Sequence, residues 1–95
     1  MEQFNAKVLT ELLGQTVDIT DSVGSGVTLT VSEVVESSMN GDEWEAFSVY
    51  LTGEESFHIS QGTYKVAHSA FGERDLFISP KSPVEYEIII NRKRG

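Results

Sequence analysis

The sequence predicts a mainly β protein, a six-stranded antiparallel meander that forms a small barrel or roll, with one short N-terminal helix. Apolar and polar residues alternate through most runs after residue 14. Glycine, asparagine and proline separate these runs at short intervals, as in small all-β folds. Ninety-five residues with 39% hydrophobic content predict a single domain, residues 1–95, with one modest core.

The first element is expected to be a helix over residues 6–13. Asn5 suits the N-cap, and Gly14 stands where a left-handed C-terminal residue belongs. Phe4 can pack against Leu9 as a hydrophobic staple. So short a helix is unstable alone, so we expect it to plug one open end of the barrel. Its apolar stripe would cover the β core through Val8, Leu9, Leu12 and Leu13.

Two alternating runs follow the helix, residues 16–20 and 27–31. Val34-Val35 then breaks the period of two, which predicts a bulge or bend near Ser32-Glu33. Asn40-Gly41 is typical of a type I′ hairpin turn. The next run, residues 44–52, is apolar on both faces, as expected of a central strand.

Three further strands are predicted around residues 64–68, 75–79 and 84–90. We expect positive φ at Gly62 or Gly72 or both, because each lies in a predicted turn. Pro80 ends the fifth strand, since proline cannot donate to a ladder. The residues expected to be mainly buried are Val17, Ile19, Leu29, Val31, Val49, Leu51, Tyr64, Val66, Leu76 and Ile88.

The charge balance argues against a nucleic-acid partner. The net charge is −8, and three of the seven basic residues form the tail Arg92-Lys93-Arg94. The remaining chain is strongly acidic and repels phosphate backbones. The tail itself is expected to be a solvated terminus, with a small electrostatic handle as the alternative.

Other sequence features indicate the cellular compartment of the protein. The chain has no cysteine, and no apolar run approaches the ~20 residues of a membrane helix. Residues 1–4 lack the basic and apolar regions of a signal peptide. We therefore expect a cytoplasmic protein with no membrane partner.

One stretch carries a family resemblance. Gln61-Gly62-Thr63-Tyr64 is followed by His68, Gly72 and Leu76-Phe77. This stretch resembles a small bacterial domain family of unknown function. The resemblance also covers Leu12 to Gln15, Phe47 to Gly53, Pro80, Tyr86-Glu87 and Asn91-Arg92. The family often has proline after the histidine, where this chain has Ser69. The resemblance implies an association with gene clusters that encode phage-tail-collar-like proteins, and it brings no catalytic residue.

His68 is the first candidate for chemistry. Glu73 and Asp75 follow it across the predicted turn, and one histidine with two carboxylates could contribute to a metal site. Metal sites usually need three or four convergent ligands, however. We therefore expect no metal or other cofactor, and we expect His68 to satisfy a backbone group of its turn.

His58 is the second candidate. Ser56 and Ser60 stand two residues away on either side, which permits a Ser–His contact on one strand face. A hydrolytic triad also needs an orienting group and an oxyanion hole, and the chain has no nucleophile-elbow motif. A small metal-dependent or hydrolytic enzyme that uses His58 or His68 remains the alternative function.

The preferred hypothesis is a non-enzymatic domain that acts by protein–protein contact, as a structural accessory of an assembly. Its partner would be another protein or a further copy of the chain. Phe71, at a predicted loop tip, and Trp44 are the candidate interaction residues. An unpaired strand edge at either end of the meander could also pair with a partner. A third possibility is a ligand carrier, although so small a barrel should be filled by its own side chains.

Overall fold

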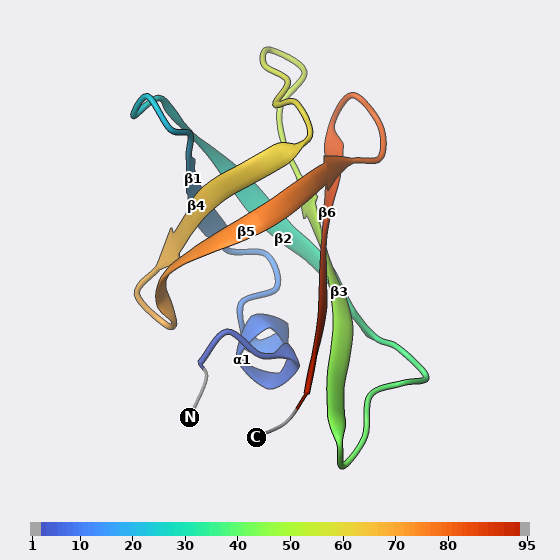
Figure 1. Cartoon of the computed structure of the whole chain (residues 1–95). Coiled ribbons are helices and arrows are strands. Elements are labelled where there is room, and N and C mark those ends of the chain that lie inside the picture. Colours follow the sequence, from blue (N-terminus) through green and yellow to red (C-terminus); the bar gives the residue numbers. More distant parts are fainter. Residues whose placement is uncertain (1–2, 94–95) are drawn as a thin grey trace.

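The computed structural model describes residues 3–93 and confirms the predicted fold class (Figure 1). A short helix precedes six antiparallel strands that close into a barrel in the order β1-β2-β3-β6-β5-β4. The elements are α1 (Ala6–Glu11), β1 (Thr16–Thr20), β2 (Gly26–Glu36), β3 (Trp44–Thr52), β4 (Gly62–His68), β5 (Gly72–Pro80) and β6 (Glu85–Lys93).

The connectivity differs from a strictly sequential meander. The strands β1-β2-β3 form one three-stranded unit and β4-β5-β6 form another. Strand β6 pairs with β3 along its whole length, and β1 pairs with β4 from Asp18 opposite Ala67 to Thr20 opposite Lys65. Residues 53–61 cross from one unit to the other. The first and last strands therefore each have two neighbours, and the free edges expected at the ends of a meander are paired.

The barrel is weakest where β5 meets β6. This β5–β6 seam contains two paired positions, Ser79 opposite Glu87 and Pro80 opposite Tyr86. Beyond them the strands diverge, and α1 lies between their separated ends in the view of Figure 1. Phe4, Leu9 and Leu12 are part of the buried core, so the N-terminal segment and the helix cover part of the barrel interior.

Phe4 connects this plug to the barrel. Its ring packs edge-on against Phe71, with centroids 4.9 Å apart, and lies 6.3 Å from the ring of Phe47. Its carbonyl accepts a hydrogen bond of 2.6 Å from Nη2 of Arg92, whose Nε donates to Glu45 at 2.7 Å. Arg92 is therefore held by the fold, and its assignment to a solvated tail is wrong. Lys93 is exposed, and Arg94 lies outside the described residues.

The helix has the predicted caps but is shorter than expected. Asn5 Oδ1 accepts a hydrogen bond from the Val8 amide at 2.9 Å, and Gly14 has φ +86°. Leu12 is buried, but Leu13 is 46% exposed, which contradicts its predicted packing on the core. The reason is that the helix ends at Glu11, so Leu13 leaves the helical face on which the staple residues lie.

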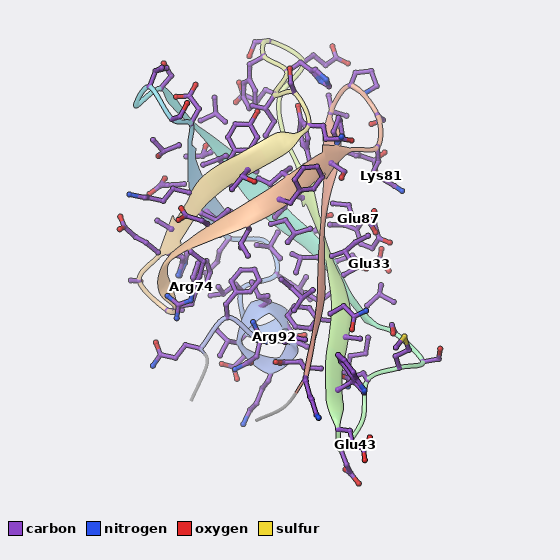
Figure 2. The ribbon with its side chains drawn as sticks, in the orientation of Figure 1. Glu33, Glu43, Arg74, Lys81, Glu87 and Arg92 are labelled. Atoms are coloured by element: carbon purple, nitrogen blue, oxygen red, sulfur yellow. The ribbon has the colours of Figure 1, made fainter. Side chains whose placement is uncertain are left out.

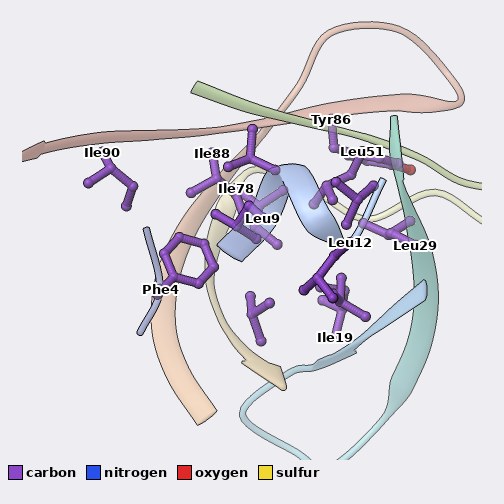
Figure 3. Close-up of a cluster of buried hydrophobic side chains, with 14 of the residues drawn as sticks. Phe4, Leu9, Leu12, Ile19, Leu29, Leu51, Ile78, Tyr86, Ile88 and Ile90 are labelled. Atoms are coloured by element: carbon purple, nitrogen blue, oxygen red, sulfur yellow. The ribbon is translucent and has the colours of Figure 1, made fainter. Parts of the chain in front are cut away.

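Apolar side chains fill the barrel interior (Figure 3). Eight of the ten residues predicted to be buried are buried, whereas Tyr64 and Leu76 are only partly so. These two lie opposite each other on β4 and β5, and the Tyr64 hydroxyl donates to the Ser60 carbonyl at 2.6 Å. Tyr64 therefore extends toward the loop that precedes β4 and stays at the margin of the core.

The predicted bulge is present in β2. The register shifts between Val31 and Glu33, where Val31 faces Leu51 and Glu33 faces Tyr50. The extra residue is Ser32, whose hydroxyl donates to the Tyr50 carbonyl at 3.0 Å. The bulge changes which side chains of β2 point outward for the rest of the strand.

Two of the turn predictions can be compared with backbone angles. Gly72 has φ +80°, as expected for at least one of the two glycines, whereas Gly62 begins β4 without positive φ. The type I′ turn at Asn40-Gly41 is wrong, because Gly41 has no positive φ and a seven-residue loop joins β2 to β3. Asn40 shapes this loop by accepting from the Ala46 amide at 3.1 Å and donating to Glu36 at 2.7 Å.

Candidate functional site

His68 serves its own hairpin, as predicted. Its Nδ1 accepts a hydrogen bond from the Ala70 amide at 2.9 Å, so Nε2 carries the proton and donates to Gln15 Oε1 at 3.1 Å. The imidazole also stacks on Phe71, with centroids 5.9 Å apart. Both ring nitrogens of His68 form hydrogen bonds, so His68 would have to lose one of them to coordinate a metal ion.

The two carboxylates expected near His68 do not converge on it. Glu73 lies 4.0 Å from the ammonium of Lys65, and Asp75 is the ladder partner of that same lysine. Across residues 3–93, no group of three or more histidine, cysteine, aspartate or glutamate side chains is close enough to hold a metal ion. The structure therefore does not bring His68, Glu73 and Asp75 together as a metal site.

His58 lies in the crossing segment, near the other end of β4. Its Nδ1 is 3.3 Å from the Tyr86 hydroxyl, which accepts from the Ile59 amide at 3.2 Å. Ser56 donates to Glu54 at 3.1 Å instead of contacting the imidazole. Since Tyr86 is fully buried, these bonds fix the crossing segment over the core. The arrangement supplies no activated serine.

Phe71 is not available as an interaction residue. It is 1% exposed and packs between Phe4 and His68. An apolar residue at a loop tip can either fold inward or face a partner, and here the N-terminal plug provides an inward contact. The structure thus corrects one of the two proposed interaction residues.

Trp44, the second proposed residue, is 39% exposed at the start of β3. Cross-strand pairing places it opposite Lys93 on β6. Residues that face each other in an antiparallel ladder share one side of the sheet. Trp44 therefore belongs to the outward side of β3, together with Ala46, Ser48 and Tyr50.

Three further apolar side chains project from this side of the barrel. Val35 pairs with Ser48, which pairs with Ile89, so the three lie in one row across β2, β3 and β6. Phe77 is exposed on β5, the strand that follows β6 in the barrel, two residues before the last paired position of these strands, Ser79 opposite Glu87. Exposed fractions are 42% for Val35, 65% for Ile89 and 51% for Phe77. We call Val35, Trp44, Phe77 and Ile89 the outer apolar face.

This clustering distinguishes the four residues from incidental exposure. They are four of the seven large apolar side chains exposed in the described part of the chain. Single exposed apolar residues are normal on protein surfaces, but contiguous ones mark interaction sites. The sequence carried a signal for one of them, since Ile89 occupies the side of β6 that Glu85 and Glu87 share.

A polar row borders the outer apolar face, with Glu33, Tyr50 and Glu87 opposite one another on β2, β3 and β6. Glu87 is buried and forms an ion pair of 3.3 Å with Lys81. A hydrogen bond with Glu87, and then the charge of that carboxylate, raise the pKa of Tyr50 above its ordinary value. Lys81, Glu87 and Glu33 follow one another down one side of the molecule in Figure 2.

Two cavities among residues 3–93 bear on the carrier alternative. A cavity of about 90 Å³ lies at the barrel end between Ile19, Val27, Ile59 and Tyr64. Pockets for small organic ligands are several times larger, on the order of 300–1,000 Å³. A broader depression of about 500 Å³ lies over the outer surface of β1 and β2 and is open to solvent. These dimensions do not favour the carrier alternative.

The comparisons with known proteins agree with the resemblance to an uncharacterised family. A family model described as "Domain of unknown function (DUF6916)" matches residues 4–90. No curated protein and no solved structure matches the chain. Among the described residues, no helix is long and apolar enough to cross a membrane.

Proposed function

Because the chain belongs to the DUF6916 family, whose description assigns no activity, we propose a function from its surface: a non-enzymatic domain that acts by protein–protein contact. The observation that carries this proposal is the outer apolar face. Val35 and Ile89 lie in one row across β2, β3 and β6, Trp44 extends the same side of the sheet, and Phe77 is exposed on the neighbouring strand β5. Covering this row with a partner would remove apolar surface from water, which is the main driving force of association.

The role that fits such a domain is a structural accessory of a larger assembly. Its interior is filled by its own side chains, so the domain presents a surface and not a chamber. The resemblance to proteins of phage-tail-collar-like gene clusters suggests that the assembly is phage-tail-like. That extension depends on the resemblance alone, whereas the docking role depends on the exposed side chains.

The enzymatic alternative has less support. His58 and His68 lie near opposite ends of β4, Ser56 donates to Glu54 rather than to His58, and Glu73 lies beside Lys65 rather than His68. A stoichiometric metal in the purified protein, or a turnover lost on His58→Ala or His68→Ala, would favour the enzyme over the interaction domain.

Site-specific photo-crosslinking tests the proposal. The photoreactive residue p-benzoylphenylalanine replaces Ile89 in one variant and Thr28 in the other, and each variant is expressed in the cells from which the gene comes. Thr28 is exposed on the outer side of β2, where it pairs with Asp18. We expect a discrete protein adduct at position 89 and none at position 28. Equal yields at the two positions, or no adduct at position 89, would contradict the proposal.

A further inference from the structure

The dipeptide Asn40-Gly41 lies in the loop that joins β2 to β3. An asparagine that precedes a glycine can react with its own backbone, because the glycine nitrogen can attack Cγ of the asparagine side chain. Glycine favours this attack, since it has no Cβ to hinder the approach. Gly41 is exposed, and in the described part of the chain no atom beyond its chain neighbours lies within 4 Å of the place that a Cβ would take. Water therefore has access to the dipeptide.

The reaction needs water as its only co-reactant. A bond forms between the Gly41 nitrogen and Cγ of Asn40, and the bond from Cγ to Nδ2 breaks. Ammonia leaves with the proton that the Gly41 nitrogen gives up. Water then opens the cyclic imide at either of its carbonyls, which leaves aspartate or isoaspartate at position 40. One side-chain amide is thus hydrolysed to a carboxylate and ammonia, and no oxidant or reductant takes part.

The folded loop engages both reacting groups. The Gly41 N–H donates to the Trp44 carbonyl at 2.8 Å. The Asn40 side chain is held at both ends, since Oδ1 accepts from the Ala46 amide at 3.1 Å and Nδ2 donates to Glu36 at 2.7 Å. A backbone amide can only donate, which fixes this orientation of the side chain. Rotating Asn40 toward the Gly41 nitrogen would break both of its bonds, and deprotonating that nitrogen would break the third.

We propose that Asn40-Gly41 is a latent modification site, which the folded loop protects from conversion to aspartate or isoaspartate and which becomes reactive when the loop opens. Loops open locally at a lower free energy than the whole domain unfolds, so opening of this loop sets the rate of conversion. Each hydrogen bond favours the closed loop by roughly a factor of five. Three bonds together should slow the conversion on the order of 100-fold relative to the unfolded chain.

The product of the reaction cannot restore the closed loop. An aspartate at position 40 has no N–H to donate, and its carboxylate would face that of Glu36 where a 2.7 Å hydrogen bond now lies. Isoaspartate also inserts an extra carbon into the backbone next to Gly41, whose N–H holds the Trp44 carbonyl. Because the released ammonia is lost, the change is irreversible. Modification at this position therefore records that the loop has opened.

Peptide mapping by mass spectrometry measures the conversion at neutral pH, and isoaspartyl methyltransferase labels the isoaspartate. We expect position 40 to convert on the order of 100-fold faster in chain unfolded with guanidinium chloride than in folded chain. Asn5 and Asn91 precede alanine and arginine, so they are internal controls that should stay unmodified over the same period. Equal rates at position 40 in folded and unfolded chain would overturn the proposal, as would an unmodified Asn40 in the unfolded chain.

Variants at Glu36 test the protection separately from the reactivity. Glu36→Ala removes the acceptor of Asn40 Nδ2 and should accelerate conversion in the folded chain about fivefold. Glu36→Gln keeps an acceptor at this position and should change the rate little. Neither variant should alter the rate in the unfolded chain. An unchanged folded-state rate in Glu36→Ala would contradict protection by this bond.

A variant at Gly41 tests the attacking group. Gly41→Ala adds a Cβ where the structure leaves open space, at a residue without positive φ, so the fold should be kept. Conversion at position 40 in the unfolded variant should nevertheless slow several-fold, because the Cβ hinders the attacking nitrogen. Thermal unfolding verifies that this variant and the two Glu36 variants fold. A rate in unfolded chain that Gly41→Ala leaves unchanged would overturn attack by the Gly41 nitrogen.

Discussion

The N-terminal segment is expected to be an integral part of the barrel, and truncating Phe4 tests this. Phe4 is 1% exposed. It contacts Phe47 on β3 and Phe71 in the turn between β4 and β5, so it touches both three-stranded units. In Phe4→Ala, the buried ring that joins the N-terminal segment to the barrel core is removed. The substitution leaves the Phe4 carbonyl, and so the bond from Arg92, chemically intact.

The expected magnitude follows from the burial. Truncation of a fully buried phenylalanine to alanine costs about 3–5 kcal/mol, from the lost transfer free energy and the cavity left behind. The edge-on contact with Phe71 accounts for roughly 0.5–1.5 kcal/mol of this. Because the whole domain is expected to be stable by only about 5–15 kcal/mol, the loss is a large fraction of the total.

Urea denaturation followed by circular dichroism measures the effect. With a slope of about 1.5 kcal/mol per molar, the unfolding midpoint of Phe4→Ala should fall by about 2–3 M. The unfolding midpoint of Phe4→Leu, which keeps most of the side-chain volume, should fall by less than half as much. Leu13→Ala is the matched control, because Leu13 is exposed and should change stability by no more than about 0.5 kcal/mol. Equal midpoints for Phe4→Ala and Leu13→Ala would refute the integral role of the segment.

Three further predictions concern individual contacts. Gly72→Ala should destabilise by about 1 kcal/mol or more, because φ +80° is strained for any other residue, whereas Gly62→Ala should be nearly neutral in the same thermal unfolding assay. His68→Ala should lower the free energy of unfolding by about 1 kcal/mol, because the Ala70 amide loses its acceptor. His68→Asn should keep most of the stability, since asparagine can accept from the same amide. Equal losses of stability in the two variants would contradict this. In a spectrophotometric titration, Glu87→Gln should lower the raised pKa of Tyr50 toward its ordinary value, and an unchanged phenol titration would count against the hydrogen bond between Tyr50 and Glu87.

The sign of that last effect fixes a pH dependence. The folded chain holds the Tyr50 proton more tightly than the unfolded chain does, because the Tyr50 pKa is raised. The resulting stabilisation is complete below the ordinary tyrosine pKa of about 10 and is lost as the pH rises through the folded pKa. The loss of stability above pH 10 should therefore be smaller in Glu87→Gln.

The fold class was predictable because its determinants are local. Alternation within Thr16–Thr20 and Gly26–Glu36 specifies strands whatever their partners are, and Asn5 and Gly14 mark the helix ends by themselves. Strand order depends on contacts between distant residues, such as Asp18 with Ala67. No local pattern distinguishes β6 from β4 as the neighbour of β3, which is why the predicted meander lacked the crossing segment.

The candidate surface was predictable only in part, for the same reason. Trp44 was identified, but Phe71 was assigned to the surface because the sequence does not show that Phe4 reaches it. Phe77 was hidden in a continuous apolar run, where alternation does not reveal which side chain points outward. Ile89 stood on the glutamate side of its strand, and that mismatch is the signal that sequence reasoning could have used.

The bulge at Ser32 has an evolutionary consequence for the surface. Side chains alternate strictly along a strand, so a one-residue change in length exchanges the two sides of everything beyond it. The bulge already makes this exchange, because Val31 faces the core while Glu33, two residues later, faces outward. Deleting Ser32 would make Glu33 follow Val31 directly, with Glu33 still opposite Tyr50 and Val35 still opposite Ser48. A codon lost here would thus remove the local bend of the bulge and leave the exterior of β2 unchanged. Homologues that lack this residue should therefore differ in the twist of β2 before they differ in what they bind.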